Sequence, residues 1–156
     1  ISKDQKFNGI QVEKDIDNFL LQEKITLKES DKYCFDDRKY FIKDNLVSYG
    51  NHTANHYMLS SLSKDEQYHE INECKKFINK LNVNKSEVFS IPFGGDDSFN
   101  KDTLLILEYL NYKTVLKSTN DLDAYSISNE ICRFMPKSYA IKKTLKKLFL
   151  KKMIRR

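Results

Sequence analysis

Apolar residues recur along this chain with two different periods, which predict helices alternating with strands. Near the N-terminus, apolar positions at helical spacing within residues 11–29 indicate a surface helix with a break at Thr26. These positions are Val12, Ile16, Phe19 and Leu20. A second short helix is predicted over residues 35–45. Its expected inward-facing residues are Phe35, Tyr40 and Phe41.

The middle of the chain has the most regular pattern. Residues 46–49 predict a short strand that Gly50 stops. Ser63 and Glu66 form a capping box, in which each side chain bonds to the backbone N–H of the other residue. The helix that begins there is predicted to run to about Leu81 with one apolar face. That face comprises Tyr68, Ile71, Cys74, Ile78 and Leu81.

The alternation continues after this helix. Residues 87–91 predict a strand that ends at Pro92, and Asn100 can cap a helix that stops at Asn111 in a left-handed conformation. The further strands predicted are 112–116 and a weaker one, 131–135. Strand, helix, strand, helix, strand implies parallel strands with helices packed outside, and therefore an α/β sheet or barrel.

Two histidines follow the first of these strands. His52 and His56 are four residues apart, one helical turn, so both imidazoles can face the same point. Sites in parallel α/β folds lie at the C-terminal ends of the strands. Two histidine ligands leave the other positions of a metal to a carboxylate and water, as a catalytic metal requires. The alternative is a pair of surface histidines that share this spacing.

A second candidate loop follows the strand over 87–91 and lies on the same rim. Pro92, Phe93, Gly94 and Gly95 break the strand there, and glycine permits positive φ and close approach of a ligand to the backbone. A backbone N–H at Phe93 or Gly94 can stabilise an oxyanion. The alternative is an ordinary turn from a strand into a helix.

Together the two loops resemble motifs of the polysaccharide deacetylase family, also described as the NodB-homology or carbohydrate esterase family. That family has an H-[ST]-x-x-H motif and, later, an R-x-P-[YF]-G-like motif. Residues 52–56 match the first motif fully, and residues 90–94 match the second except that Ser90 stands in place of Arg. The resemblance covers residues 46–136, including the helix between the motifs.

The resemblance implies a distorted (β/α) barrel in which an Asp-His-His triad binds a divalent metal, often zinc. A second Asp acts as general base for the water that attacks the acetamide carbonyl of an N-acetylated sugar, and a backbone N–H helps to hold the oxyanion. By this resemblance, His52 and His56 are metal ligands. Phe93 supplies the backbone N–H, and Pro92, Phe93 and Gly94 form the substrate loop.

The chain departs from the family pattern in its aspartates. Residues 34–38 look similar to the first family motif, but they lie close before His52 and no Gly follows them. We interpret Asp36 and Asp37 as the start of a helix, where acids favour the positive end of the dipole. The carboxylate ligand and the base are therefore expected upstream of Ile1, in a domain truncated at its N-terminus, with Asp36 or Asp37 as the alternative source.

Two further family features are missing. Ser90 replaces the Arg that would orient the base, and residues 133–136 occupy the region of the late Leu-x-His motif that supplies a general acid. His69 is no substitute, because it lies in the middle of the predicted helix and is expected to be solvated.

Composition fits one globular domain. The chain has 156 residues, of which 40% are hydrophobic and 31% charged. No apolar run approaches the roughly 20 residues that span a bilayer, and the polar N-terminus shows no signal peptide. The odd number and wide spacing of the cysteines indicate small buried or half-buried thiols rather than disulfides or a zinc cluster. They are Cys34, Cys74 and Cys132.

The excess of positive charge lies at the C-terminal end. Residues 137–156 hold nine Lys or Arg and no acid, in a chain of net charge +5. Within residues 141–156, apolar positions at helical spacing predict a basic amphipathic helix, which either docks on an anionic membrane or packs against the barrel. The apolar positions are Ile141, Leu145, Leu148, Phe149, Leu150, Met153 and Ile154.

We therefore predict a partial deacetylase domain over residues 1–140 and a basic helix over 141–156. The predicted function is metal-dependent deacetylation of N-acetylated sugars in cell-surface polysaccharide metabolism, with zinc the expected metal. The alternative is an inactive deacetylase-like domain that binds glycan. No nucleic-acid partner is expected, because no basic-aromatic patch lies outside the tail. The expected location is the cytoplasm or the inner face of the membrane.

Overall fold

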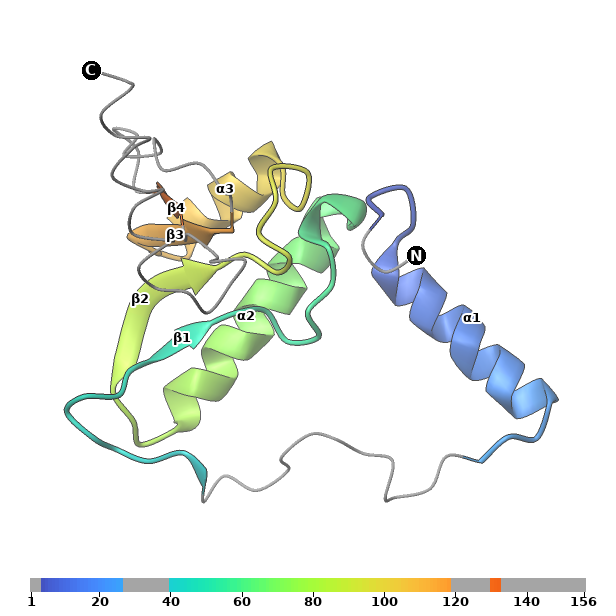
Figure 1. The fold of residues 1–156 in the computed structure, drawn as a ribbon, viewed down its shortest axis with the longest axis horizontal. Coiled ribbons are helices and arrows are strands. Elements are labelled where there is room, and N and C mark those ends of the chain that lie inside the picture. Colours follow the sequence, from blue (N-terminus) through green and yellow to red (C-terminus); the bar gives the residue numbers. More distant parts are fainter. Residues whose placement is uncertain (1–3, 27–39, 119–129, 133–156) are drawn as a thin grey trace, which may run out of the picture.

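The computed structural model describes residues 4–26, 40–118 and 130–132 (Figure 1). Helices and strands alternate along these residues from the first strand onward. The elements are α1 (Gly9–Gln22), β1 (Tyr49–Asn51), the 3-10 helix η3 (Leu59–Ser61), α2 (Lys64–Lys80), β2 (Lys85–Ser90), α3 (Lys101–Tyr109), β3 (Thr114–Lys117) and β4 (Glu130–Cys132). The predicted C-terminal helix over 141–156 lies outside the described residues.

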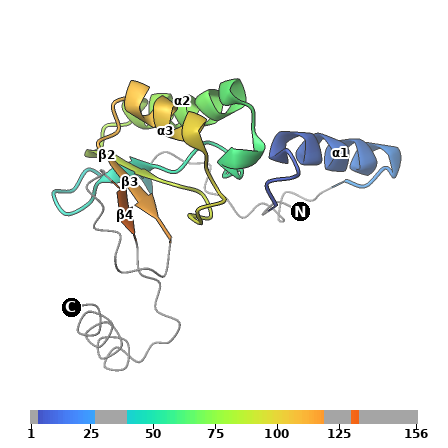
Figure 2. The same cartoon turned by 90° about the horizontal axis from the view of Figure 1, so that it is seen from above.

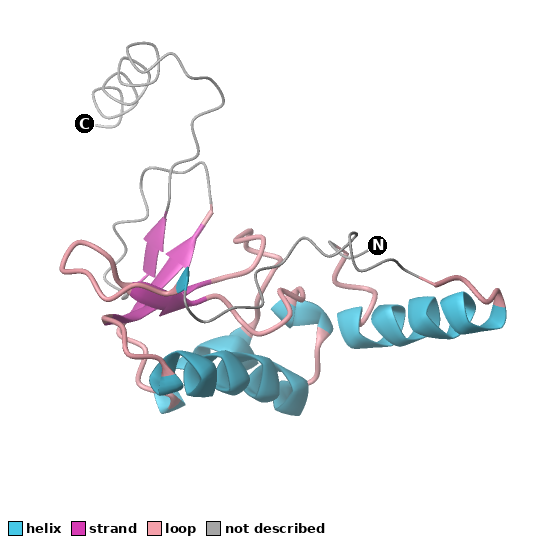
Figure 3. Cartoon of the chain, turned by 90° about the horizontal axis from the view of Figure 1, so that it is seen from below, coloured by secondary structure: helices cyan, strands magenta, loops and turns pink. Residues whose placement is uncertain are grey.

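The four strands form one parallel sheet in the order β1-β2-β3-β4. Helices α2 and α3 cover one face of this sheet, as Figures 2 and 3 show. The parallel α/β sheet is thus confirmed, and it brings the C-terminal ends of the strands to one edge. Closure into a barrel goes beyond what the described residues contain and stays a prediction.

Both predicted helix starts are confirmed. The Ser63 side chain accepts from Glu66 N–H, and the Glu66 carboxylate accepts from Ser63 N–H at 2.8 Å. Asn100 caps α3 through a second reciprocal pair with Thr103. Asn111 follows α3 with φ 61°, the left-handed stop that the sequence predicted.

The core lies between the sheet and the two helices. Its central residues are fully buried and come from β2, α2, α3 and η3. The core cluster comprises Leu59, Leu62, Ile71, Phe89, Ile91, Ile106, Leu107, Leu110 and Val115. None of the helices in the described part of the chain is long and apolar enough to cross a bilayer.

The first strand differs from the prediction. It spans Tyr49–Asn51, so Gly50 lies within the strand and does not stop it. A Cβ on Gly50 would meet the Val88 carbonyl oxygen at 3.1 Å, a tight contact, so a larger residue would require the neighbouring backbone to shift slightly. The register between β1 and β2 also shifts at this point.

The predicted helix over 35–45 is wrong for the residues that the structure describes. Residues 40–45 hold no α-helix, and an isolated bridge joins Asp44 to Val47. Phe41 does pack inward, against Tyr49 and Phe77, whereas Tyr40 is exposed. Phe35 lies outside the described residues.

Two other helical predictions need correction. Helix α1 ends at Gln22, before the predicted break at Thr26, because Lys24 adopts φ 54° and cannot continue a right-handed helix. Tyr68 was expected on the inner face of α2, but it is 37% exposed and its ring pairs with that of Tyr109. The buried stripe of α2 includes Gln67 and Glu70 instead.

Helix α1 is tied to the rest of the fold at its first turn. The Asn8 side-chain oxygen caps α1, and its amide donates to the Glu66 carboxylate at 3.0 Å. Gly9 lies against the ring of Tyr57, where a Cβ would come within 2.7 Å. Ile10 packs against the core cluster. In Figure 1, α1 then extends away from the sheet.

Ile71 and Leu105 offer a matched test of the core. Ile71 is fully buried under the sheet, whereas Leu105 on α3 is 45% exposed. We expect Ile71→Ala to lower the free energy of unfolding by about 2–5 kcal/mol, because it removes buried apolar area and leaves a cavity. Leu105→Ala should cost less than about 1 kcal/mol. Urea unfolding followed by circular dichroism measures both, and equal losses would contradict this placement of the core.

Candidate metal centre

His52 follows β1 directly and reaches across to the end of the neighbouring strand. Its Nδ1 lies 2.7 Å from the backbone oxygen of Ser90, the last residue of β2. A carbonyl oxygen only accepts hydrogen bonds, so Nδ1 must carry the proton. In the neutral ring the lone pair is then on Nε2, as in histidines that bind metals while a carbonyl holds the other nitrogen.

His56 lies beside His52. The two ring centroids are 4.7 Å apart, and the centroid of the Phe93 ring lies 4.8 Å from that of His56. Partial desolvation lowers the pKa of His56, and repulsion from a charged His52 lowers it further. The two predicted loops therefore do meet at one rim of the sheet, with two imidazoles and Phe93 in contact.

The rings converge for a different reason from the one that the spacing suggested. Residues 52–56 form a loop and not a helical turn, because Thr53 and His56 both have positive φ, 67° and 59°. The Thr53 N–H donates to the Asn51 side chain at 2.9 Å, and the His56 N–H donates to the Thr53 hydroxyl at 3.0 Å. These bonds stabilise a backbone that a β-branched residue rarely adopts.

Glu70 of α2 holds the middle of this loop. Its carboxylate accepts from the backbone N–H of Asn55 at 2.8 Å and from the Asn55 amide at 2.7 Å. Its backbone oxygen accepts from Ala54 N–H at 3.1 Å. Glu70 is only 2% exposed, so the loop is anchored to the buried side of the helix.

Asn51 fixes the start of the loop. Its buried amide donates to the Ile71 carbonyl at 2.8 Å and to the Tyr112 hydroxyl at 2.6 Å. Burial raises the pKa of Tyr112, which therefore keeps its proton. Cys74 is half-buried beneath the loop, and burial raises the pKa of its thiol although the His52 N–H opposes the shift. This agrees with the small half-buried thiol predicted for Cys74.

The second loop turns sharply after β2. Pro92 is buried, Phe93 has φ 62° and Gly94 has φ 74°. The Gly94 N–H donates to the Pro92 carbonyl at 2.7 Å, within the turn. The oxyanion role of the Phe93 N–H stays a prediction. A Cβ on Gly94 would lie 2.5 Å from Ser118, which follows β3, so only glycine fits.

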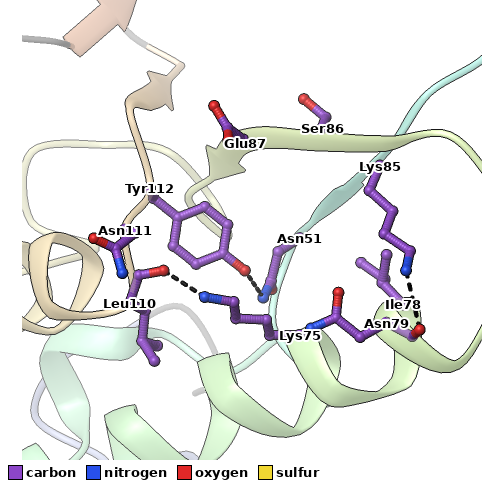
Figure 4. A pocket seen from close by; sticks show the side chains of 10 residues that line it. All are labelled: Asn51, Lys75, Ile78, Asn79, Lys85, Ser86, Glu87, Leu110, Asn111 and Tyr112. Carbon is purple, nitrogen blue, oxygen red and sulfur yellow. Dashed lines mark hydrogen bonds between the residues drawn. The ribbon is translucent and has the colours of Figure 1, made fainter.

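A cavity of about 290 Å³ lies elsewhere, between α2 and the starts of β2 and β3. Neither histidine lines it. As Figure 4 shows, its polar groups point at one another: Lys75 donates to the Leu110 carbonyl and Lys85 to the Asn79 carbonyl. The cavity therefore takes no part in the site, although Asn51 lies on its wall and reaches the histidine loop from there.

The residues fit a metal in part. Two imidazoles with convergent rings, one of them held by a carbonyl, are suitable donors for a divalent ion. Among residues 4–26, 40–118 and 130–132, however, no group of three or more His, Cys, Asp or Glu side chains could hold a metal. Asp36, Asp37 and the region 133–136 lie outside these ranges. His69 is exposed on α2, as expected.

Sequence reasoning missed the partners that hold the histidines. The Ser90 contact uses a backbone oxygen and leaves no trace in the residue type. Asn51 looked like an ordinary polar residue beside His52. Glu70 did give a signal, because it lies in the buried stripe of α2 next to Ile71, where an acidic residue requires a partner.

The fold and the loops define a class of protein: a parallel α/β domain whose candidate ligands lie beyond the C-terminal ends of the strands. The family model described as polysaccharide deacetylase matches residues 34–115, slightly more than half of the chain. The chain belongs to the polysaccharide deacetylase family. No curated protein and no solved structure matches it. The family implies a hydrolase that acts on carbon–nitrogen bonds, with a carbohydrate substrate.

Adjacent glycines test the second loop. Gly94→Ala should lower the free energy of unfolding by about 2–4 kcal/mol, because the new methyl group meets Ser118 and the positive φ disfavours alanine. Gly95→Ala should cost less than about 1 kcal/mol, because the one short contact of its Cβ is with the movable Asp97 carboxylate and Ser98 lies at ordinary contact distance. Denaturant titration of both variants compares them, and a larger loss for Gly95→Ala would show that the turn is built differently.

Proposed function

We propose that the intact protein is a metal-dependent deacetylase of N-acetylated sugars, in which His52 and His56 hold a divalent cation. One observation carries this proposal: the two rings lie 4.7 Å apart, and the Nδ1 of His52 is engaged by the Ser90 carbonyl. Histidines that bind a metal almost always donate their other ring N–H to such a partner. Family membership supports the reaction class.

Each histidine is prepared for the ligand role in its own way. His52 keeps its proton on Nδ1, so Nε2 is available to bind. The pKa of His56 is lowered, which favours the neutral ring that binds a metal. When bound, a divalent cation would acidify water and polarise an acetamide carbonyl. Zinc is the proposed ion, because imidazoles with a carboxylate and an open position are typical of catalytic zinc.

The second loop would bind the reacting group. The ring of Phe93 lies against that of His56, so the second loop contacts one of the proposed ligands. We assign its N–H to the oxyanion that forms when water adds to the acetamide carbonyl. Pro92 and Gly94 keep this turn in place, Pro92 by its burial and Gly94 by its close approach to Ser118.

A carboxylate must complete the proposed centre. Since the described residues offer no third ligand in a cluster, this group and the general base would come from outside the described ranges. The family barrel would bring such a carboxylate to the same rim, because its strands all point their C-terminal ends there. Cell-surface polysaccharide is the substrate class that the proposal names.

Zinc affinity of the three histidine variants tests the site. We expect His52→Ala and His56→Ala to weaken zinc binding by more than the roughly 10–100-fold that loss of outer partners costs, because each removes a ligand. His69→Ala is the matched control, since it removes an exposed histidine on α2 and should bind like the unaltered protein. Competition with a chromogenic chelator measures all three. Equal affinities in the three variants would exclude the site.

Acetate release tests the reaction. The intact protein should release acetate from N-acetylglucosamine oligomers after loading with zinc, and His52→Ala and His56→Ala should abolish the release while His69→Ala retains it. Binding of the oligomers without acetate release would replace the hydrolase with a glycan-binding domain.

A further inference from the structure

Glu70 is a buried carboxylate behind the histidine loop. It is 2% exposed, and in the described part of the chain it makes no ion pair. Instead it accepts two hydrogen bonds from one residue, Asn55. Burial of a carboxyl group carries a desolvation cost, which the two short bonds at 2.8 Å and 2.7 Å offset.

The two bonds from Asn55 to Glu70 lie next to a strained residue. Asn55 directly precedes His56, and His56 has a strained φ of 59°. Strained backbone persists only where surrounding contacts over-determine it. Because one Glu70 oxygen binds the backbone N–H of Asn55 and the other binds its side chain, the residue before His56 is fixed to α2 at two points.

Among the contacts that the structure describes, Glu70 reaches the histidine rings only through the backbone. The described contacts of its side chain are with Asn55, and the ring of His56 contacts His52 and Phe93 instead. Its effect on His56 is therefore one of placement. His52 has its own support at Ser90, so His56 is the ring that depends on Glu70.

We propose that Glu70 is a positioning residue of the metal centre, which clamps Asn55 and thereby sets the distance between the His56 and His52 rings. This inference rests on the proposed function, in which the two histidines hold a divalent cation. It assigns a role in cation binding to a buried acid that is not itself a ligand.

The chemistry of the clamp allows a conservative replacement. In Glu70→Gln, the side-chain oxygen can still accept from the Asn55 backbone. The new amide can donate to the Asn55 side-chain oxygen once that amide turns over. Glu70→Ala provides neither bond. Asn55→Ala is a milder change, because Asn55 is exposed and its backbone N–H remains.

The experiment compares zinc affinities of full-length chains by competition with a chromogenic chelator. We expect a loss of about 10–100-fold in Glu70→Ala, a several-fold loss in Asn55→Ala, and near-normal affinity in Glu70→Gln. The matched control is Glu73→Ala, one turn along α2, where the carboxylate pairs with Lys76 in solvent. It should bind zinc normally.

A second measurement separates positioning from stability. With Co²⁺ in place of zinc, the visible absorption band reports the ligand arrangement, and it should change in Asn55→Ala and Glu70→Ala but not in Glu70→Gln. If Glu70→Ala does not fold, Asn55→Ala carries the comparison. An unchanged affinity and an unchanged band in Asn55→Ala would overturn the proposal.

The zinc measurements test the metal centre and the Glu70 clamp separately. If His52→Ala and His56→Ala bind zinc as the unaltered protein does, the proposed metal centre is wrong. If those variants lose zinc but the Asn55 and Glu70 variants do not, the centre stands and only the clamp is wrong.

Discussion

The hydrogen bond between His52 Nδ1 and the Ser90 carbonyl is the contact on which the rest of the site depends. It joins the ends of two neighbouring parallel strands, so it exists only when β1 and β2 pair in the observed register. It also selects one tautomer of the ring. The pairing of the two strands therefore also determines which nitrogen of His52 carries the lone pair. The second loop follows β2, so the same strand end brings Phe93 to His56.

The loop between the two histidines is held from below by polar groups that belong to the core layer. Asn51 bridges Tyr112 and Thr53, and Glu70 binds Asn55, so two buried side chains govern four consecutive exposed or strained residues. Positive φ at Thr53 and His56 is unfavourable by itself, by about 1–3 kcal/mol each. Buried hydrogen bonds offset the cost of these two conformations, and they are strong because the dielectric constant around them is low.

The sequence predicted the features that leave a mark in residue type. Ser63, Asn100 and Asn111 marked helix ends, and the alternation of strand and helix patterns predicted the parallel sheet. Gly50 was misjudged because a glycine can end a strand or admit a close neighbour, and the choice depends on Val88, which is distant in sequence. The convergence of His52 and His56 was expected from helical spacing, yet the actual geometry depends on backbone conformation and on Ser90 O, neither of which the residue letters encode.

Glu66 serves two helices with one carboxylate, since it completes the cap of α2 and accepts from the Asn8 amide that caps α1. The contacts that the described residues show for α1 lie at this end, whereas Phe19 and Leu21 near the other end are exposed. A helix of 14 residues is about 20 Å long, so a tilt of about ten degrees at Glu66 would sweep its far end through roughly 4 Å. Helix α1 is therefore anchored at its first turn, where Glu66 joins its cap to that of α2, and Phe19 and Leu21 present apolar surface at the far end.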